Sequence, residues 1–331
     1  MKRHVFLGGL IVAAGGLAVC ASALAAGRAP DVSSAAIDAA EAWAFPVSPA
    51  ADPKAAAPDL RKVLHVAGST RSYTLGEFSF FNPPDWFPQD HPPMPRIVAH
   101  GRKPAWSCAA CHLPDGEGSP ASAALTGLPK AYILEQLAAF RHGLRGASLP
   151  LTTRDMAHEA RRLDESDMQR AAAYFSSLPF RPRTRVVETA TVPKTHWRDY
   201  VLMTNRDGAR ERIGARIIAT PADVRDYEDR DARTEYVAYV PPGSIERGAI
   251  IAAKGVSAAL PCESCHGASL QGVGNIPPLA GRSPVYIARE LILFRTGERT
   301  NPGAAPMRLE ASHLSVGDMI AVAAYAASRR P

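Results

Sequence analysis

The sequence predicts an all-α fold in which two tandem copies of one small helical domain are accompanied by long irregular segments. The first observation is an internal repeat. The stretch "GRKPAWSCAACHLPDGEG", from Gly101, recurs 154 residues later as "GVSAALPCESCHGASLQG", from Gly255. At the same offset "LTGLPKAYILEQLAAFRHGLR" matches "LAGRSPVYIARELILFRTGER". The second observation is the 29 prolines among 331 residues, which predict many loops and few long strands. Self-similarity of this kind indicates two copies of one domain.

Each copy is predicted to consist of helices. Ile133, Leu137 and Phe140 have the spacing i, i+4 and i+7 and form one apolar stripe on a helix. The same residue types recur in the second copy at Ile287, Leu291 and Phe294. Farther along the offset falls to 151, and the last helix of each copy is predicted to begin with a capping pair. These pairs are Asp164 with Asp167 and Ser315 with Asp318.

Changes in composition divide the chain into five segments. They are an export signal (1–25), a Pro- and Ala-rich N-terminal extension (26–92), the first helical domain (93–180), a charged connector (181–242) and the second helical domain (243–331). We expect the connector to be a solvated arm with charges of both signs, or alternatively a docking surface for a partner protein. We expect the aromatic and proline cluster "PPDWFP" of the extension to wrap over the first domain.

The first 25 residues have the three-part pattern of an export signal. A basic tip precedes an apolar run, and the small residues that follow predict cleavage near Ala25, which would place the mature protein in the periplasm. Two alternatives stay open. The apolar run of 22 residues from Val5 to Ala26 is long enough to remain in the membrane as an anchor. Cys20 is a candidate for lipidation, although the preceding valine fits that pattern poorly.

Outside the leader, the four cysteines form two CxxC pairs, and a histidine follows each pair directly. Two disulfides or a structural zinc site would account for four thiols, but neither explains the repeated histidine. CxxCH is the attachment sequence for c-type haem, because residues three apart share one face of a helical turn. Both sulfurs can then bond to one porphyrin while the histidine binds its iron. The sequence therefore predicts two covalently bound haem c groups. The predicted attachment residues are Cys108, Cys111 and His112 in the first domain and Cys262, Cys265 and His266 in the second.

A second axial ligand is predicted in each domain. Met156 and Met307 match at the offset of 151 and lie in proline-marked stretches that we expect between helices. A methionine that closes the iron favours electron transfer at a raised potential. Two further methionines, Met168 and Met319, also match, but they lie on the apolar stripe of the last helix and are predicted to be core. The alternative ligands are two histidines that do not occupy equivalent positions, His158 and His313.

These features resemble the tandem class I c-type cytochromes. The resemblance covers about 95–180 and 243–330. It rests on the two CxxCH motifs, the helix that ends Phe-Arg-x-Gly-x-Arg, the downstream methionine and the closing helix with Asp-Met and Ala-Ala-Tyr. It implies haem c with His/Met ligation in each domain and electron transfer without bond-making. It also implies contacts of Arg145 and Arg299 with haem propionates. Exposed positions at helix ends are the alternative for these two arginines.

The expected function is that of a periplasmic diheme electron carrier rather than an enzyme. It would transfer single electrons from a dehydrogenase or a quinol-oxidising complex to a downstream cytochrome or oxidase. The alternatives are a peroxidase-like haem enzyme, in which one iron loses its sixth ligand, and a dedicated cytochrome subunit of a periplasmic dehydrogenase. The net charge of +6, to which the leader contributes Lys2 and Arg3, is too small and dispersed to predict nucleic-acid binding.

Overall fold

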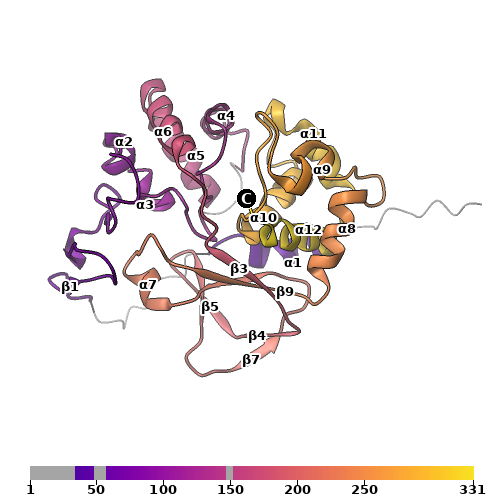
Figure 1. Cartoon of the computed structure of the whole chain (residues 1–331), viewed down its shortest axis with the longest axis horizontal. Helices are drawn as coiled ribbons and strands as arrows, with labels where there is room; N and C mark the ends of the chain where they lie inside the picture. Colours follow the sequence, from indigo (N-terminus) through magenta and orange to yellow (C-terminus); the bar gives the residue numbers. More distant parts are fainter. Residues whose placement is uncertain (1–33, 48–56, 147–151) are drawn as a thin grey trace, which may run out of the picture.

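The computed structural model describes residues 34–47, 57–146 and 152–331. The predicted leader, with Cys20, lies outside these residues. Figure 1 shows the helices of the first domain on one side, those of the second on the other, and the strands of the connector beneath them. None of the described helices is both long and apolar enough to cross a membrane.

The described residues of the first domain form five helices around one core. The predicted stripe of Ile133, Leu137 and Phe140 is buried in that core. The predicted cap is confirmed, because the Asp164 carboxylate accepts a 2.7 Å hydrogen bond from the backbone N–H of Asp167. The five helices are α2 (Arg96–Ala99), α3 (Ala109–His112), α4 (Lys130–Arg141), α5 (Thr152–Arg162) and α6 (Glu165–Ser177).

The second domain repeats this plan with a longer first helix. Ser315 and Asp318 form the predicted capping box at the start of the last helix. The first and last helices cross so closely at Gly248 that a Cβ there would lie 2.0 Å from the Ala321 carbonyl oxygen, so this crossing requires glycine. The helices are α8 (Ser244–Lys254), α9 (Glu263–His266), α10 (Pro284–Thr296), α11 (Ala305–Ser312) and α12 (Val316–Ser328).

The N-terminal extension contacts both domains. Helix α1 (Ser34–Ala44) packs on the second domain, where Trp43 and Phe45 join its core. The part that follows contains the antiparallel strands β1 (Val63–Leu64) and β2 (Tyr73–Thr74) and lies beside the first domain. Its aromatic side chains Trp86 and Phe87 form a separate small core, so the cluster predicted from the sequence is largely buried.

The predicted all-α fold class is wrong, because the connector folds into short strands. In its three-stranded sheet, β9 pairs in parallel with β3 and antiparallel with β8. Two further pairs are antiparallel, β4 with β7 and β5 with β6. The elements are β3 (Thr184–Glu188), β4 (Thr191–Pro193), β5 (Thr195–Arg198), β6 (Val201–Thr204), β7 (Arg210–Arg212), β8 (Ile218–Pro221), α7 (Val224–Glu228) and β9 (Tyr236–Val240).

The expectation of a solvated connector is also wrong. Along β9 the side chains of Tyr236, Ala238 and Val240 are buried, whereas the intervening ones are only partly buried. This alternation places the apolar residues on one face of the sheet, and Ala238 and Val240 belong to the core of the second domain. The connector therefore forms a folded layer against that domain.

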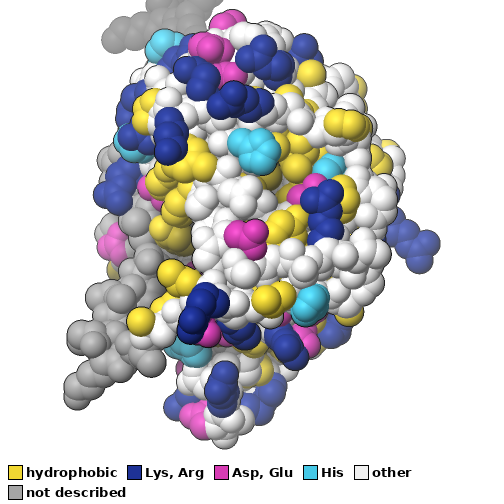
Figure 2. All heavy atoms as spheres, turned by 90° about the vertical axis from the view of Figure 1, so that its left-hand side faces the viewer, with side chains coloured by type: hydrophobic (Ala, Val, Ile, Leu, Met, Phe, Trp, Pro, Cys, Tyr) yellow, Lys and Arg dark blue, Asp and Glu magenta, His cyan; other side chains and the backbone are white. Residues whose placement is uncertain are grey.

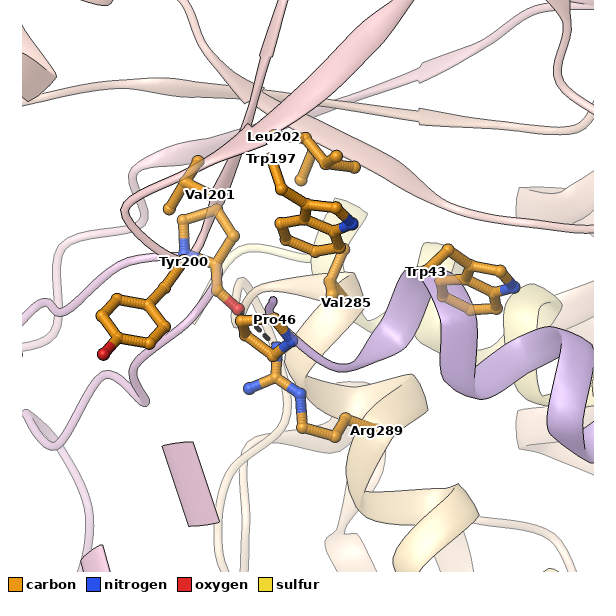
Figure 3. Close-up of a pocket in the computed structure, with 10 residues that line it drawn as sticks. Trp43, Pro46, Trp197, Tyr200, Val201, Leu202, Val285 and Arg289 are labelled. Carbon is orange, nitrogen blue, oxygen red and sulfur yellow. Dashed lines mark hydrogen bonds between the residues drawn. The ribbon is translucent and has the colours of Figure 1, made fainter. Parts of the chain in front are cut away.

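A small pocket lies where the extension, the connector and the second domain meet (Figure 3). Trp43 from α1, Trp197 from β5 and Val285 from α10 are among the residues that line it. Its volume of about 10 Å³ is roughly the room needed by one water molecule. The three segments thus pack closely at this junction.

Candidate haem-binding sites

Each CxxCH motif forms a single helical turn. The backbone N–H of His112 donates to the Cys108 carbonyl at 2.9 Å, and that of His266 donates to the Cys262 carbonyl at the same distance. Each turn ends at a residue with positive φ, Leu113 with φ 66° in the first domain and its match Gly267 with φ 79° in the second. None of the four cysteines is in a disulfide. Among the described residues no group of three or more His, Cys, Asp or Glu side chains is arranged to hold a metal ion.

The two histidines make equivalent hydrogen bonds. Nδ1 of His112 donates to the Ala123 carbonyl at 2.8 Å, and Nδ1 of His266 donates to the matching carbonyl, that of Pro277, at 2.9 Å. This bond fixes the tautomer with the proton on Nδ1. Within the described residues Nε2 of each ring has no hydrogen-bond partner, and it is thus available as a ligand. Burial lowers the pKa of both imidazoles, which keeps them neutral as ligation requires.

The methionines Met156 and Met307 occupy matching places, although the stretches that carry them were expected to be irregular. Met156 lies on α5 and Met307 on α11. Each is partly buried against the core of its own domain, as is the first cysteine of that domain's motif. The structure therefore puts both methionines on short helices rather than between helices.

The other predicted or alternative ligands have different environments. Met168 and Met319 are buried within the two cores, as predicted. The His158 side chain is half exposed, with Nδ1 3.5 Å from the Glu159 carboxylate. His313 lies at the C-terminal end of α11.

Arg145 and Arg299 are not exposed helix-end residues, and this alternative is wrong. Both are only 4% exposed, and their backbones form an isolated antiparallel bridge between the two domains. Their guanidinium groups bind opposite oxygens of the Glu290 carboxylate at 2.6 Å each. Both also donate to the Gln136 side-chain oxygen, at 3.1 and 2.8 Å.

The partners of these arginines were missed at the level of sequence. Each arginine also donates to a tyrosine of the other domain, Arg145 to Tyr286 at 3.0 Å and Arg299 to Tyr132 at 2.9 Å. A signal was present, because Tyr and a Gln or Glu recur at i and i+4 in both repeats. The two residues therefore share a helix face that also meets the other domain.

Two further arginines of the second domain hold a loop of the first. Arg282 donates to the carbonyls of Ala124 and Thr126 at 2.8 and 2.9 Å. Arg289 donates to those of Pro120 and Ala121, both at 2.9 Å. This loop, residues 120–126, contains the Ala123 carbonyl that accepts the hydrogen bond from His112. The second domain thus fixes the orientation of a histidine in the first.

The residues present fit one haem in each domain. The two cysteine side chains of each CxxCH turn would hold the porphyrin, and the free Nε2 of the following histidine would bind the iron. Nε of Arg145 and Nε of Arg299 are buried and have no hydrogen-bond partner among the described residues. Each arginine therefore retains a donor for an anionic group, in addition to the bonds already made within the protein.

Two helical domains with this turn and this histidine define a protein that binds haem covalently at two sites. The sequence profile of the cytochrome c family matches residues 98–179. Cytochrome c-554(548) from Halomonas halodenitrificans is 38% identical over 69 residues, which cover 20% of this chain and 83% of that protein. The chain belongs to the cytochrome c family. It is a tandem class I c-type cytochrome with two covalently bound haem c groups.

Longer similarities extend over most of the chain. A thiosulfate dehydrogenase electron acceptor from Stutzerimonas stutzeri (strain A1501) is 28% identical over 227 residues, 68% of this chain and 79% of that protein. Cytochrome c4 from Pseudomonas aeruginosa is 27% identical over 232 residues, 69% of this chain and 86% of that protein. The solved thiosulfate dehydrogenase (TsdBA) from Marichromatium purpuratum has a TM-score of 0.49 at 26% identity, over 71% of this chain and 39% of that one. The relatives define this chain as a diheme electron-transfer cytochrome.

Proposed function

We propose that the protein carries single electrons in the periplasm, from a dehydrogenase or a quinol-oxidising complex to a downstream cytochrome or oxidase, and that it is not itself an enzyme. Haem iron supplies the one-electron chemistry when bound. The observation that carries the proposal is the equivalence of the two histidines, whose Nδ1 atoms donate to matching carbonyls at 2.8 and 2.9 Å. The peroxidase-like alternative, in which one iron loses its sixth ligand, would need one of the two sites to be altered.

The proposed ligand sets are His112 with Met156 and His266 with Met307. The two methionines are buried in matching ways, which supports this assignment. Each packs against the core of its domain, and the first cysteine of that domain's CxxCH motif packs against the same core. The half-exposed His158, which lies beside a carboxylate, is a poorer candidate. The unpartnered Nε atoms of Arg145 and Arg299 support the proposed contacts with haem propionates.

The location and the donor rest on the sequence and on the relatives. The export pattern of residues 1–25 supports the periplasm, and the mass of the mature protein would distinguish cleavage near Ala25 from a retained membrane anchor. Similarity to a thiosulfate dehydrogenase electron acceptor supports a dehydrogenase as the donor, with this chain either as a free carrier or as its dedicated subunit.

The test is the absorption and electron paramagnetic resonance spectrum of the oxidised, haem-loaded protein. We expect two low-spin signals with His/Met character and one-electron reduction of both haems. A high-spin iron that reacts with peroxide would favour the peroxidase-like alternative instead. A colourless exported protein would contradict haem attachment at the two CxxCH motifs.

A further inference from the structure

The two CxxCH motifs lie in very different surroundings, although their second cysteines, Cys111 and Cys265, are both exposed. In the first domain other segments of the chain cover the motif. The ring of Trp106 stacks on Phe80 of the N-terminal extension, with centroids 4.0 Å apart. The Ala110 carbonyl accepts a hydrogen bond from Arg230 of the connector, and Ala110 is only 5% exposed.

The loop after each motif shows the same contrast. In both domains its tip is closed by a pair of backbone hydrogen bonds, between Ser119 and Ser122 and between the matching Val273 and Ile276. The tip of the first domain packs against α10, where Arg289 binds two of its carbonyls. The tip of the second domain is open, since a Cβ on Gly274 would meet nothing within 4 Å.

The uncovered motif is surrounded by exposed apolar side chains. Leu260 is 59% exposed, and its match in the first domain is the stacked Trp106. Val273 is 58% exposed, and Ile276 is 39% exposed. Leu309 is 61% exposed on α11, and the residue after it, Glu310, accepts a 2.7 Å hydrogen bond from the backbone N–H of Leu260 through its carboxylate. We call these four residues and Cys265 the Cys265 face.

The Cys265 face also has very little charge. Residues 255–281 include one acidic side chain, Glu263, and no lysine or arginine, whereas the matching residues 101–127 contain four charged side chains. Outside this range, the Glu310 carboxylate that accepts the Leu260 N–H and the exposed Arg308 side chain add one charge of each sign at the margin. The side of the molecule that carries the first domain has lysine and arginine side chains scattered across it (Figure 2).

We propose that the Cys265 face is the docking site for a redox protein whose own contact surface is apolar and uncharged, so that electrons enter and leave this cytochrome at the second domain. The inference rests on the proposed function, because it takes Cys265 as a haem attachment residue. Burial of the four apolar side chains would stabilise the complex. A partner with strong charge would find little complementary charge here, because the few charged side chains of the face are of both signs. On the first domain, the same chain's extension, connector and α10 already occupy the matching surface.

A docking face with so little net charge has a kinetic consequence. Charge complementarity accelerates encounter and makes the association rate depend on ionic strength. Without it, the second-order rate constant should be about 10⁵–10⁶ M⁻¹s⁻¹ and nearly independent of salt. The probe is a reduced small blue-copper protein whose copper-ligating histidine lies in an uncharged apolar patch. Each encounter transfers one electron, from Cu(I), which becomes Cu(II), to a ferric haem, which becomes ferrous.

The experiment is stopped-flow reduction of the full-length, haem-loaded cytochrome by this probe. We expect Val273→Lys and Leu260→Lys to slow the reaction roughly tenfold, because the added ammonium group must be desolvated on docking. Val273→Ser removes the apolar contact without adding charge and should slow it by roughly threefold. The matched control is Val63→Lys, since Val63 is 53% exposed on β1 of the extension. It should react like the wild type.

Reduction of the same variants by ascorbate separates this inference from the proposed function. Excess ascorbate should reduce all variants to the same extent as the wild type, which shows that both haems are intact. If the probe reduced Val273→Lys and Leu260→Lys as fast as the wild type, or if Val63→Lys slowed it equally, the docking site would be elsewhere. A steep fall of the wild-type rate with salt would also overturn the proposal. Failure of ascorbate to reduce the wild type would instead contradict the proposed function.

Discussion

Arg145 of the first domain and Arg299 of the second bind the two oxygens of a single carboxylate, that of Glu290, at 2.6 Å each. The two arginines are related by the repeat, but the carboxylate is not, because the first domain has Gln136 at the matching position. One anion thus lies between two buried cations at the contact of the domains. A charged cluster therefore holds the domain interface. Its residues occupy matching positions in the two domains, but only the second domain supplies a carboxylate.

Glu290→Gln should lower the free energy of unfolding by about 3 kcal/mol at pH 7, because two guanidinium groups would stay buried without a counter-charge. The measurement is urea unfolding of the haem-loaded protein. The matched control is the double variant Gln136→Glu/Glu290→Gln, which moves the carboxylate to a position that both arginines already contact. It should recover most of the loss. Equal stability of the single variant and the wild type would show that the cluster does not hold the domains.

The same carboxylate predicts a dependence on acid. Burial by itself would raise the pKa of Glu290, but the neighbouring guanidinium groups of Arg145 and Arg299 outweigh it and hold that pKa below its ordinary value of 4.5. Its contribution to stability is therefore complete above pH 4.5 and is lost as the pH falls below 4.5. In Glu290→Gln this part of the acid dependence should be absent.

Glu117 predicts the opposite dependence at neutral pH. Burial raises its pKa from 4.5 to about 7, and one of its oxygens has no hydrogen-bond partner among the described residues. Because the folded state holds the proton more tightly, stability should fall as the pH rises from 4.5 through 7, by on the order of 3 kcal/mol. Glu117→Gln should remove this fall. The measurement is the difference in unfolding free energy between the wild type and Glu117→Gln at each pH. The difference removes the contribution of His91, whose pKa is also raised, against the effect of burial, by its bond to Asp85.

Met156→Ala should convert the first haem to high spin and lower its potential while the covalent attachment persists, because the alanine cannot bind iron. The measurement is the paramagnetic resonance spectrum with a redox titration. Met168→Leu is the control, since Met168 is buried in the core of the same domain. An unchanged spectrum of Met156→Ala would show that the proposed ligand is wrong.

Arg282→Leu should lower the potential of the first haem by roughly 60 mV, which is about 1.4 kcal/mol for one electron, and leave the second unchanged. The substitution removes a buried cation beside the loop whose Ala123 carbonyl accepts the bond from His112, and loss of a nearby positive charge stabilises the ferric state. The control is Arg295→Leu, because Arg295 donates to carbonyls of its own domain, those of Ala311 and Leu314. A shift of the second haem alone would contradict this coupling.

The long helices of both domains and the two CxxCH turns could be predicted because their signals are local, whereas α5 and α11 were expected to be irregular. Capping at Ser315, the apolar stripe from Ile133 to Phe140, and the CxxCH spacing each depend on residues within two turns of one another. The strands of the connector could not be predicted in this way. β3 and β9 are five residues each and pair across about 50 residues of chain, so their pattern is visible only once both strands are side by side.

The sequence alone therefore determined that two similar haem-binding helical units follow one another, because covalent attachment and helix formation depend on short-range spacing. Only the tertiary structure decided how the units differ. It buried Arg145 and Arg299 against Glu290, placed Arg282 over the loop of the other domain, and covered one CxxCH motif while leaving the other open. Except for the bond between Arg299 and Glu290, these contacts join residues more than 100 positions apart. No local pattern encodes which distant surfaces will meet when apolar area is buried.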